Sequence, residues 1–90
     1  MSLLSDTEIA DGLPAKWTRD DDEIVREYTF DSYLDGVEFA GDIGEVAEEE
    51  FHHPEIIIGY KSVEVRLTSH EAGGITKDDL RLAALFDDEY

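Results

Sequence analysis

The chain has 90 residues, enough to bury one hydrophobic core but too few for two, so we expect a single domain over residues 1–90. Its 24 acidic residues against 7 lysines and arginines give a net charge of −17, which excludes a basic surface for binding nucleic acid. Hydrophobic residues make up 41% of the sequence, so it is too apolar to be an acidic disordered tail.

The acidic residues are spread along the whole chain, whereas lysine occurs only at Lys16, Lys61 and Lys77. A surface rich in carboxylates suits concentrated salt, because screening over a few ångströms removes the self-repulsion that opposes compaction. We therefore expect a halophilic source. An ordinary acidic protein with solvated helix faces is the alternative, and a melting temperature that does not change with salt would favour it.

The first third of the chain predicts a short helix followed by a hairpin. Ser5 and Glu8 form a capping-box pattern that predicts a helix over residues 6–12. Aromatic and β-branched residues then predict one strand over residues 15–18 and a longer one over residues 24–30. The acidic run between these strands is expected to form the turn.

The central segment predicts the longest helix, from Ser32 to about Glu50. Apolar and small residues recur there every three or four positions, which is the period of one helical face. The members of this face are Tyr33, Gly36, Phe39, Ala40, Ile43 and Ala47. We expect the helix to end at residues 52–54, because the residue before Pro54 is disfavoured in the α conformation.

The last third predicts a second hairpin and a final helix. Residues 56–61 and 63–69 are expected to be strands, and Thr76 with Asp79 forms a second capping pattern that opens the last helix. The expected order is α-β-β-α-β-β-α. We therefore predict an α+β fold with a four-stranded, mainly antiparallel sheet and helices packed on one face.

The sequence contains no cysteine, which excludes disulfides, thiolate zinc sites and cysteine nucleophiles. The N-terminal residues lack the basic and apolar segments of a secretion signal, and no later stretch is apolar enough to span a membrane. We expect a cytoplasmic protein that binds neither membranes nor nucleic acid.

All three histidines fall in one short region of the sequence. His52 and His53 follow the central helix, and His70 lies at the end of the last predicted strand, whose parity turns it away from the helix-covered core. Glu48 precedes His52 by one helical turn, so its carboxylate can hydrogen-bond that imidazole. Imidazoles titrate near neutral pH, which makes these residues candidates for proton transfer.

Each candidate also has a purely structural interpretation. Adjacent histidines at the C-terminal end of a helix can simply interact favourably with the helix dipole. His70 can be an ordinary loop residue. Glu48 belongs to an acidic run that is typical of a solvated helix face. Asp79 stands where a capping box needs a carboxylate, and Tyr60 is by default an aromatic residue of the sheet or core.

The sequence argues against three other kinds of chemistry. Three imidazoles and a carboxylate could hold zinc, but no histidine pair has the i, i+4 spacing of a helical metal site, so we expect no metal. The sequence has no Gly-x-Ser-x-Gly elbow, and residues 73–76 lack the spacing and lysine of a phosphate-binding loop. General acid and base chemistry without a cofactor remains.

The segment from Glu48 to Pro54, followed at fixed spacing by Tyr60, His70 and Asp79, resembles the signature of the pterin-4a-carbinolamine dehydratases. The resemblance covers nearly the whole chain. Its further positions are Trp17 and residues 28–30, 39–47, 67–70, 73–76 and 79–83.

The resemblance implies a hydro-lyase that removes water from 4a-hydroxytetrahydropterin to give quinonoid dihydropterin, within the recycling of tetrahydrobiopterin-type cofactors of aromatic amino-acid hydroxylases. It implies that His52 and His53 are the acid and the base and that His70 completes the pocket. Supporting or substrate-binding roles are implied for three further residues, Glu48, Tyr60 and Asp79.

The resemblance also implies a small-molecule pterin as the binding partner and association into homodimers or homotetramers. The sequence departs from the family pattern at Phe51, Ile56 and Ile58, which affects the expected pterin preference more than the acid and base residues. A different class stays open, namely a non-catalytic dimerisation or interaction module on the same scaffold. Retention of all three histidines favours catalysis over that alternative.

Overall fold

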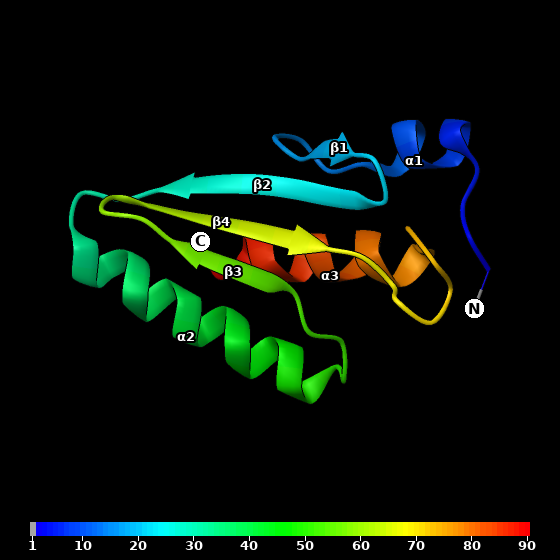
Figure 1. The fold of residues 1–90 in the computed structure, drawn as a ribbon. Coiled ribbons are helices and arrows are strands. Elements are labelled where there is room, and N and C mark those ends of the chain that lie inside the picture. Colours follow the sequence, from blue (N-terminus) through cyan, green and yellow to red (C-terminus); the bar gives the residue numbers. More distant parts are fainter. Residues whose placement is uncertain (1) are drawn as a thin grey trace.

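The computed structural model describes residues 2–90, and within this range it has three helices and one four-stranded sheet in the order α-β-β-α-β-β-α (Figure 1). The predicted α+β fold is confirmed. The elements are α1 (Asp6–Gly12), β1 (Thr18–Asp20), β2 (Glu23–Thr29), α2 (Tyr33–Glu49), β3 (Glu55–Ile58), β4 (Ser62–Leu67) and α3 (Lys77–Asp88).

The sheet is fully antiparallel, with the strand order β1-β2-β4-β3. The second hairpin therefore lies against β2 through β4, and β1 and β3 form the two edges. Every second residue of β4 is buried, namely Val63, Val65 and Leu67. This alternation gives the sheet one apolar face and one polar face, as period-two strands require.

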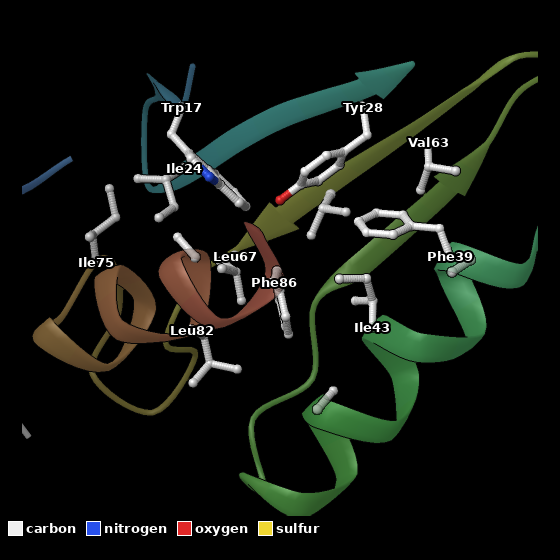
Figure 2. Packing of buried hydrophobic residues seen from close by; sticks show 14 of the residues in the cluster. Trp17, Ile24, Tyr28, Phe39, Ile43, Val63, Leu67, Ile75, Leu82 and Phe86 are labelled. Atoms are coloured by element: carbon white, nitrogen blue, oxygen red, sulfur yellow. The ribbon is translucent and has the colours of Figure 1, made fainter. Parts of the chain in front are cut away.

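Helices α2 and α3 cover the apolar face of the sheet (Figure 1). Figure 2 shows Tyr28 of β2 and Phe39 and Ile43 of α2 meeting Phe86 of α3 in the space between the layers. All four side chains are at least 96% buried. Their burial supplies the hydrophobic free energy that fixes the two long helices relative to the sheet.

The strands of the first hairpin begin and end at positions other than those predicted. The strand predicted at residues 15–18 is instead Thr18–Asp20, because Lys16 lies in a turn with a left-handed φ of 73°. Strand β2 starts and ends one residue before the prediction of 24–30, since Glu23 already pairs with Asp20.

The strands of the second hairpin are both shorter than predicted. Strand β3 ends at Ile58 rather than residue 61, because the Gly59 N–H donates to the Ser62 carbonyl at 2.7 Å and closes the turn. Strand β4 ends at Leu67 rather than residue 69. There Ser69 forms an isolated bridge with Gly74 and starts a tight loop.

Helix α2 ends at Glu49, before the histidines rather than at them. Phe51 takes a left-handed φ of 53°, and the His52 N–H donates to the Ala47 carbonyl at 3.1 Å. This is the hydrogen-bond pattern of a Schellman C-cap, in which glycine usually occupies the left-handed position. The cap, and not Pro54, therefore ends the helix and turns the chain toward β3.

Candidate active site

Two loops meet at one end of the sheet (Figure 1). The junction of α2 and β3 carries His52 and His53, and the loop between β4 and α3 carries His70. All three histidines line one open cavity of about 740 Å³. Residues 17 or more positions apart in the sequence are thus brought to a single surface, as the sequence analysis expected.

The imidazole of His52 is held between two carboxylates from the first turn of α3. Its Nε2 lies 2.7 Å from Asp79 Oδ1, and its Nδ1 lies 3.0 Å from Asp78 Oδ2. Only 14% of the side chain is exposed. The contact of Nε2 with Asp79 is a hydrogen bond, and the contact of Nδ1 with Asp78 is within ion-pair distance.

Asp79 connects the two loops of the site. Its side chain is fully buried, and its Oδ2 accepts from the Thr76 N–H and the Ser69 hydroxyl, both at 2.8 Å. The first of these bonds belongs to the predicted capping box, which is confirmed. Because Ser69 precedes His70, one carboxylate fixes the His70 loop, the start of α3 and the ring of His52.

The sequence analysis did not single out Asp78, Arg81 or Glu50. Arg81 Nε donates to Asp78 Oδ1 at 3.1 Å, and the same guanidinium pairs with Glu50, the C-cap residue of α2. The bonds to Glu50 and then to Asp78 raise the pKa of Arg81. The i, i+3 spacing of Asp78 and Arg81 on an expected helix was the available signal.

Glu48 pairs with a different histidine from the one expected. Its Oε2 contacts His53 Nε2, five residues on, whereas the sequence suggested His52 at one helical turn. The expectation of a Glu48–His52 pair is wrong, because the Schellman turn at Phe51 ends the helical spacing before His52. Both members of the Glu48–His53 pair are exposed, with 77% and 59% of their side chains accessible.

His70 reaches the cavity by a different geometry from the one predicted. Strand β4 ends before it, so strand parity does not determine its direction. It lies exposed in a turn in which the Gly73 N–H donates to the Ser69 carbonyl at 3.0 Å. Gly73 has a left-handed φ of 83°, a conformation that glycine adopts without steric cost.

Tyr60 lies outside the group of residues around the cavity. It is in the turn between β3 and β4, at the other end of the hairpin from His52 and His53, and 75% of the residue is exposed. The expectation that it is an aromatic residue of the core or sheet is wrong. Its ring contacts the ammonium group of Lys61, 5.4 Å from the ring centre.

Carboxylates outnumber fixed cations at the cavity. Glu50, Glu71 and Asp78 line it together with Arg81, whose guanidinium is already paired with two of them. Within residues 2–90, no cluster of three or more histidine, aspartate or glutamate side chains has a geometry suited to a metal ion. The same range contains no helix with the length and apolar content to cross a membrane.

These features define a small α+β protein with an open, histidine-lined cavity whose side chains can give and accept protons. The model of the family described as "Pterin 4 alpha carbinolamine dehydratase" matches residues 2–89. The chain belongs to this family.

Similar proteins occur in halophiles. A protein of Natronomonas pharaonis, provisionally named a pterin-4-alpha-carbinolamine dehydratase, is 60% identical over 85 residues, which cover 94% of this chain and 92% of that protein. A relative from Halobacterium salinarum with the same provisional name is 56% identical over 85 residues, covering 94% and 93% of the two chains. The similarity to halophile proteins agrees with the expectation drawn from the acidic composition.

Two solved structures share the fold. The structure of a transcriptional coactivator/pterin dehydratase from Brucella melitensis has a TM-score of 0.88 and 26% identity, covering 96% of both chains. A pterin dehydratase-like protein described as a RuBisCO assembly factor of the alpha-carboxysome has a TM-score of 0.66 and 22% identity, covering 81% of this chain and 84% of that one. The second likeness concerns the fold alone.

Proposed function

We propose that the protein dehydrates 4a-hydroxytetrahydropterin to quinonoid dihydropterin by general acid and base catalysis. The observation that carries the proposal is the meeting of His52, His53 and His70 at one cavity in a chain of this family. Two further residues of the family signature contact these histidines, because Asp79 pairs with His52 and Glu48 pairs with His53.

The reaction needs two proton transfers. The C4a–O bond breaks and the hydroxyl leaves as water after it receives a proton from an acid. The electron pair of the adjacent ring N–H bond forms the new carbon–nitrogen double bond, and that proton passes to a base. No electron leaves the substrate and water is the only by-product, so two imidazoles of opposite protonation state suffice.

The positions of the histidines support this chemistry. His53 uses Nε2 for Glu48, which leaves Nδ1 available, and His70 lies exposed at the cavity. A carboxylate on one ring nitrogen fixes the tautomer and orients the ring. The cavity of about 740 Å³ is within the size range of small-molecule sites.

We extend the proposal to a homo-oligomer. Strand β3 is an edge strand, and Ile57 and Ile58 on it are 47% and 42% exposed. An exposed apolar edge strand is a typical surface for pairing with a second copy. Light scattering in concentrated salt tests this, because screening removes the repulsion between two chains of charge −17. A monomer at every salt concentration would contradict it.

A second candidate function is an interaction module. The Brucella melitensis protein is described as a transcriptional coactivator/pterin dehydratase, so one scaffold is associated with both descriptions. In this chain Leu34 and Val37 on α2 are exposed and one helical turn apart. Binding alone would not require the three histidines to be present together.

The test is the rate of dehydration of a freshly generated carbinolamine in concentrated salt. The unaltered protein should accelerate the reaction, and His53→Gln and His70→Gln should each lower kcat by about 100-fold, the usual contribution of one acid or base. Glu45→Gln, an exposed change on α2, is the control and should retain the rate. No acceleration by the unaltered protein would leave the interaction module as the better explanation.

A further inference from the structure

Tyr60 carries an exposed aromatic ring at the far end of β3 from the cavity. It lies in the turn between β3 and β4, whereas His52 and His53 precede β3 at the opposite end of the hairpin (Figure 1). The residue is 75% exposed, and its ring contacts the ammonium group of Lys61. Such a ring adds little to the hydrophobic core of its own chain.

Strand β3 is an edge strand whose outward hydrogen-bonding groups follow from its register. The Gly59 N–H donates to the Ser62 carbonyl, which makes these two residues a hydrogen-bonded pair. Backbone groups alternate in direction along an antiparallel strand, so the odd-numbered residues of β3 also bond to β4. Ile56 and Ile58 therefore direct their N–H and C=O groups away from the sheet, toward any chain that adds to this edge.

A second copy of β3 satisfies all of these groups in one antiparallel register. A two-fold axis at Ile57 pairs Ile56 of each chain with Ile58 of the partner subunit, so every outward N–H and C=O group of the strand gains a bond. The next register in one direction brings Ile58 opposite Pro54, which has no N–H to donate. The next register in the other direction brings Ile56 opposite the turn. The favoured register also covers Ile57, which is 47% exposed, with its own copy.

The charges at the two ends of β3 favour the same antiparallel arrangement. The end nearest the cavity carries Glu55, and Glu48 lies beside it on His53. The other end is followed by Lys61. Antiparallel pairing places each Lys61 opposite the partner's His53, next to these carboxylates, so unlike charges meet at both ends of the interface. Complementary charges of this kind set the register and orientation of two chains.

This register brings Tyr60 to the cavity of the other chain. Tyr60 stands opposite the partner's Pro54, and the residue before that proline is His53, which lines the cavity together with Phe51. Neighbouring strands lie about 4.8 Å apart, a separation that a tyrosine side chain spans. The flat ring offers an aromatic face on which a bicyclic substrate can stack.

We propose that Tyr60 binds the pterin in the cavity of a second copy, across a two-fold interface formed by the β3 edges. Each site is then completed by the partner subunit. The inference rests on the proposed dehydratase function and on the proposed homo-oligomer. Tyr60 acts by stacking on the substrate, and proton transfer stays with the histidines of the chain that forms the cavity.

A cysteine at the two-fold axis tests the pairing without an assay of activity. The sequence has no cysteine, so Ile57→Cys introduces a single thiol opposite its own copy, at a non-hydrogen-bonded position where the Cα separation suits a disulfide. Mild oxidation in concentrated salt should convert most of the chain to a disulfide-linked dimer. Thr18→Cys on the exposed edge strand β1 is the matched control and should stay mainly unlinked. Little linked dimer from Ile57→Cys, or equal linkage of both variants, would overturn the pairing.

The role of the ring is tested by separating KM from kcat. Tyr60→Ala should raise KM by about threefold to 10-fold with kcat unchanged within about twofold, because stacking binds substrate and transition state alike. Tyr33→Ala, which removes another exposed ring, is the control and should retain both constants. Light scattering should show the same oligomer for both variants. An unchanged KM in Tyr60→Ala would contradict the inference.

Mixed oligomers show whether Tyr60 acts on its own chain or across the interface. An excess of His70→Gln chains, themselves nearly inactive, should return kcat/KM per Tyr60→Ala chain to within about twofold of the unaltered protein. Each mixed dimer has one cavity that keeps His70 and receives Tyr60 from the partner. An excess of the double variant Tyr60→Ala/His70→Gln is the control and should give no recovery. No recovery with His70→Gln chains would show that Tyr60 does not act across the interface.

Failure of the proposed function has a separate signature. If the unaltered protein does not accelerate dehydration, the proposed function fails, and the Ile57→Cys linkage still decides the pairing of β3. Calorimetry with a stable dihydropterin then replaces the KM measurement. Tyr60→Ala should raise its Kd by about threefold to 10-fold, and an excess of His70→Gln chains over Tyr60→Ala chains should restore it. An equal Kd for Tyr60→Ala and the unaltered protein would overturn the inference.

Discussion

The two ends of α3 each carry an aspartate that gathers donors from elsewhere in the chain. At the first turn, Asp79 binds Thr76, Ser69 and His52. In the last turn, Asp87 accepts from Trp17 Nε1 at 3.0 Å, from Arg26 Nη1 at 2.8 Å and from the Tyr28 hydroxyl at 2.6 Å. The two clusters use the same residue type on the same helix.

The difference between the clusters lies in the donors and in the dipole of the helix. A carboxylate is favoured at the N-terminus of a helix and disfavoured at the C-terminus, so Asp87 depends more on its partners. Those partners are an indole, a guanidinium and a phenol, none of which changes its charge near neutral pH. Asp79 holds an imidazole beside an open cavity. The partners therefore decide which end stabilises the fold and which end belongs to the site.

The largest effect is expected for Asp79→Ala. It removes a helix cap and leaves buried donors without an acceptor, which should lower the free energy of unfolding by about 3 kcal/mol. It also frees the ring of His52, so kcat should fall by about 100-fold. Urea denaturation and dehydration rates measure the two effects. A loss of stability with kcat unchanged would show that the Asp79 cluster has only a structural role, like the Asp87 cluster at the other end of α3.

Asp87→Asn should lower stability without lowering activity. It leaves the largely buried Arg26 without a charged partner and weakens the bonds from Trp17 and Tyr28, which should cost about 2 kcal/mol. For a domain of this size the melting temperature should fall by roughly 10 °C. Below the melting transition, kcat should stay within about twofold. A fall in kcat as large as that of Asp79→Ala would remove the contrast between the clusters.

Tyr28→Phe gives the Asp87 cluster a pH signature. Burial and then the hydrogen bond to Asp87 raise the pKa of Tyr28 above its ordinary value. The folded state therefore favours the neutral phenol. The resulting contribution to the free energy of unfolding is fully present below the ordinary pKa near 10 and is lost as the pH rises above it. The unaltered protein should lose stability above pH 10 more steeply than Tyr28→Phe, which should be about 1 kcal/mol less stable at neutral pH. Urea titrations at several pH values measure both, and equal slopes would contradict the prediction.

Phe51→Gly should give the smallest change, a gain in stability. Phe51 is 89% exposed and left-handed, so glycine removes the steric cost of this conformation and loses little buried surface. We expect a gain of about 0.5–1 kcal/mol, reduced by the greater freedom of glycine in the unfolded chain. Phe51→Ala is the matched control, because it removes the ring but keeps the Cβ and therefore the steric cost of the left-handed conformation. Equal stability of the two variants would show that the turn is not strained.

Local patterns in the sequence determined much of the fold and identified the histidines that lie at the cavity. The capping boxes at Ser5 and Thr76 are both present, and the predicted apolar stripe of the central helix is the buried face of α2 except for Tyr33, which is 49% exposed. Such features depend on residues three or four positions apart, so neighbouring sequence is enough to specify them. The spacing of the family signature likewise named the three histidines that line the cavity.

The tertiary structure decided which carboxylate meets which histidine. A left-handed turn at Phe51 moved the contact of Glu48 from His52 to His53, and the packing of α3 brought Asp78 and Asp79 to His52. Residues 26 and 27 positions apart meet only after the sheet and helices have packed, because hydrophobic burial sets the positions of the elements. Sequence alone therefore supplied the three histidines, and packing decided which carboxylates contact His52 and His53.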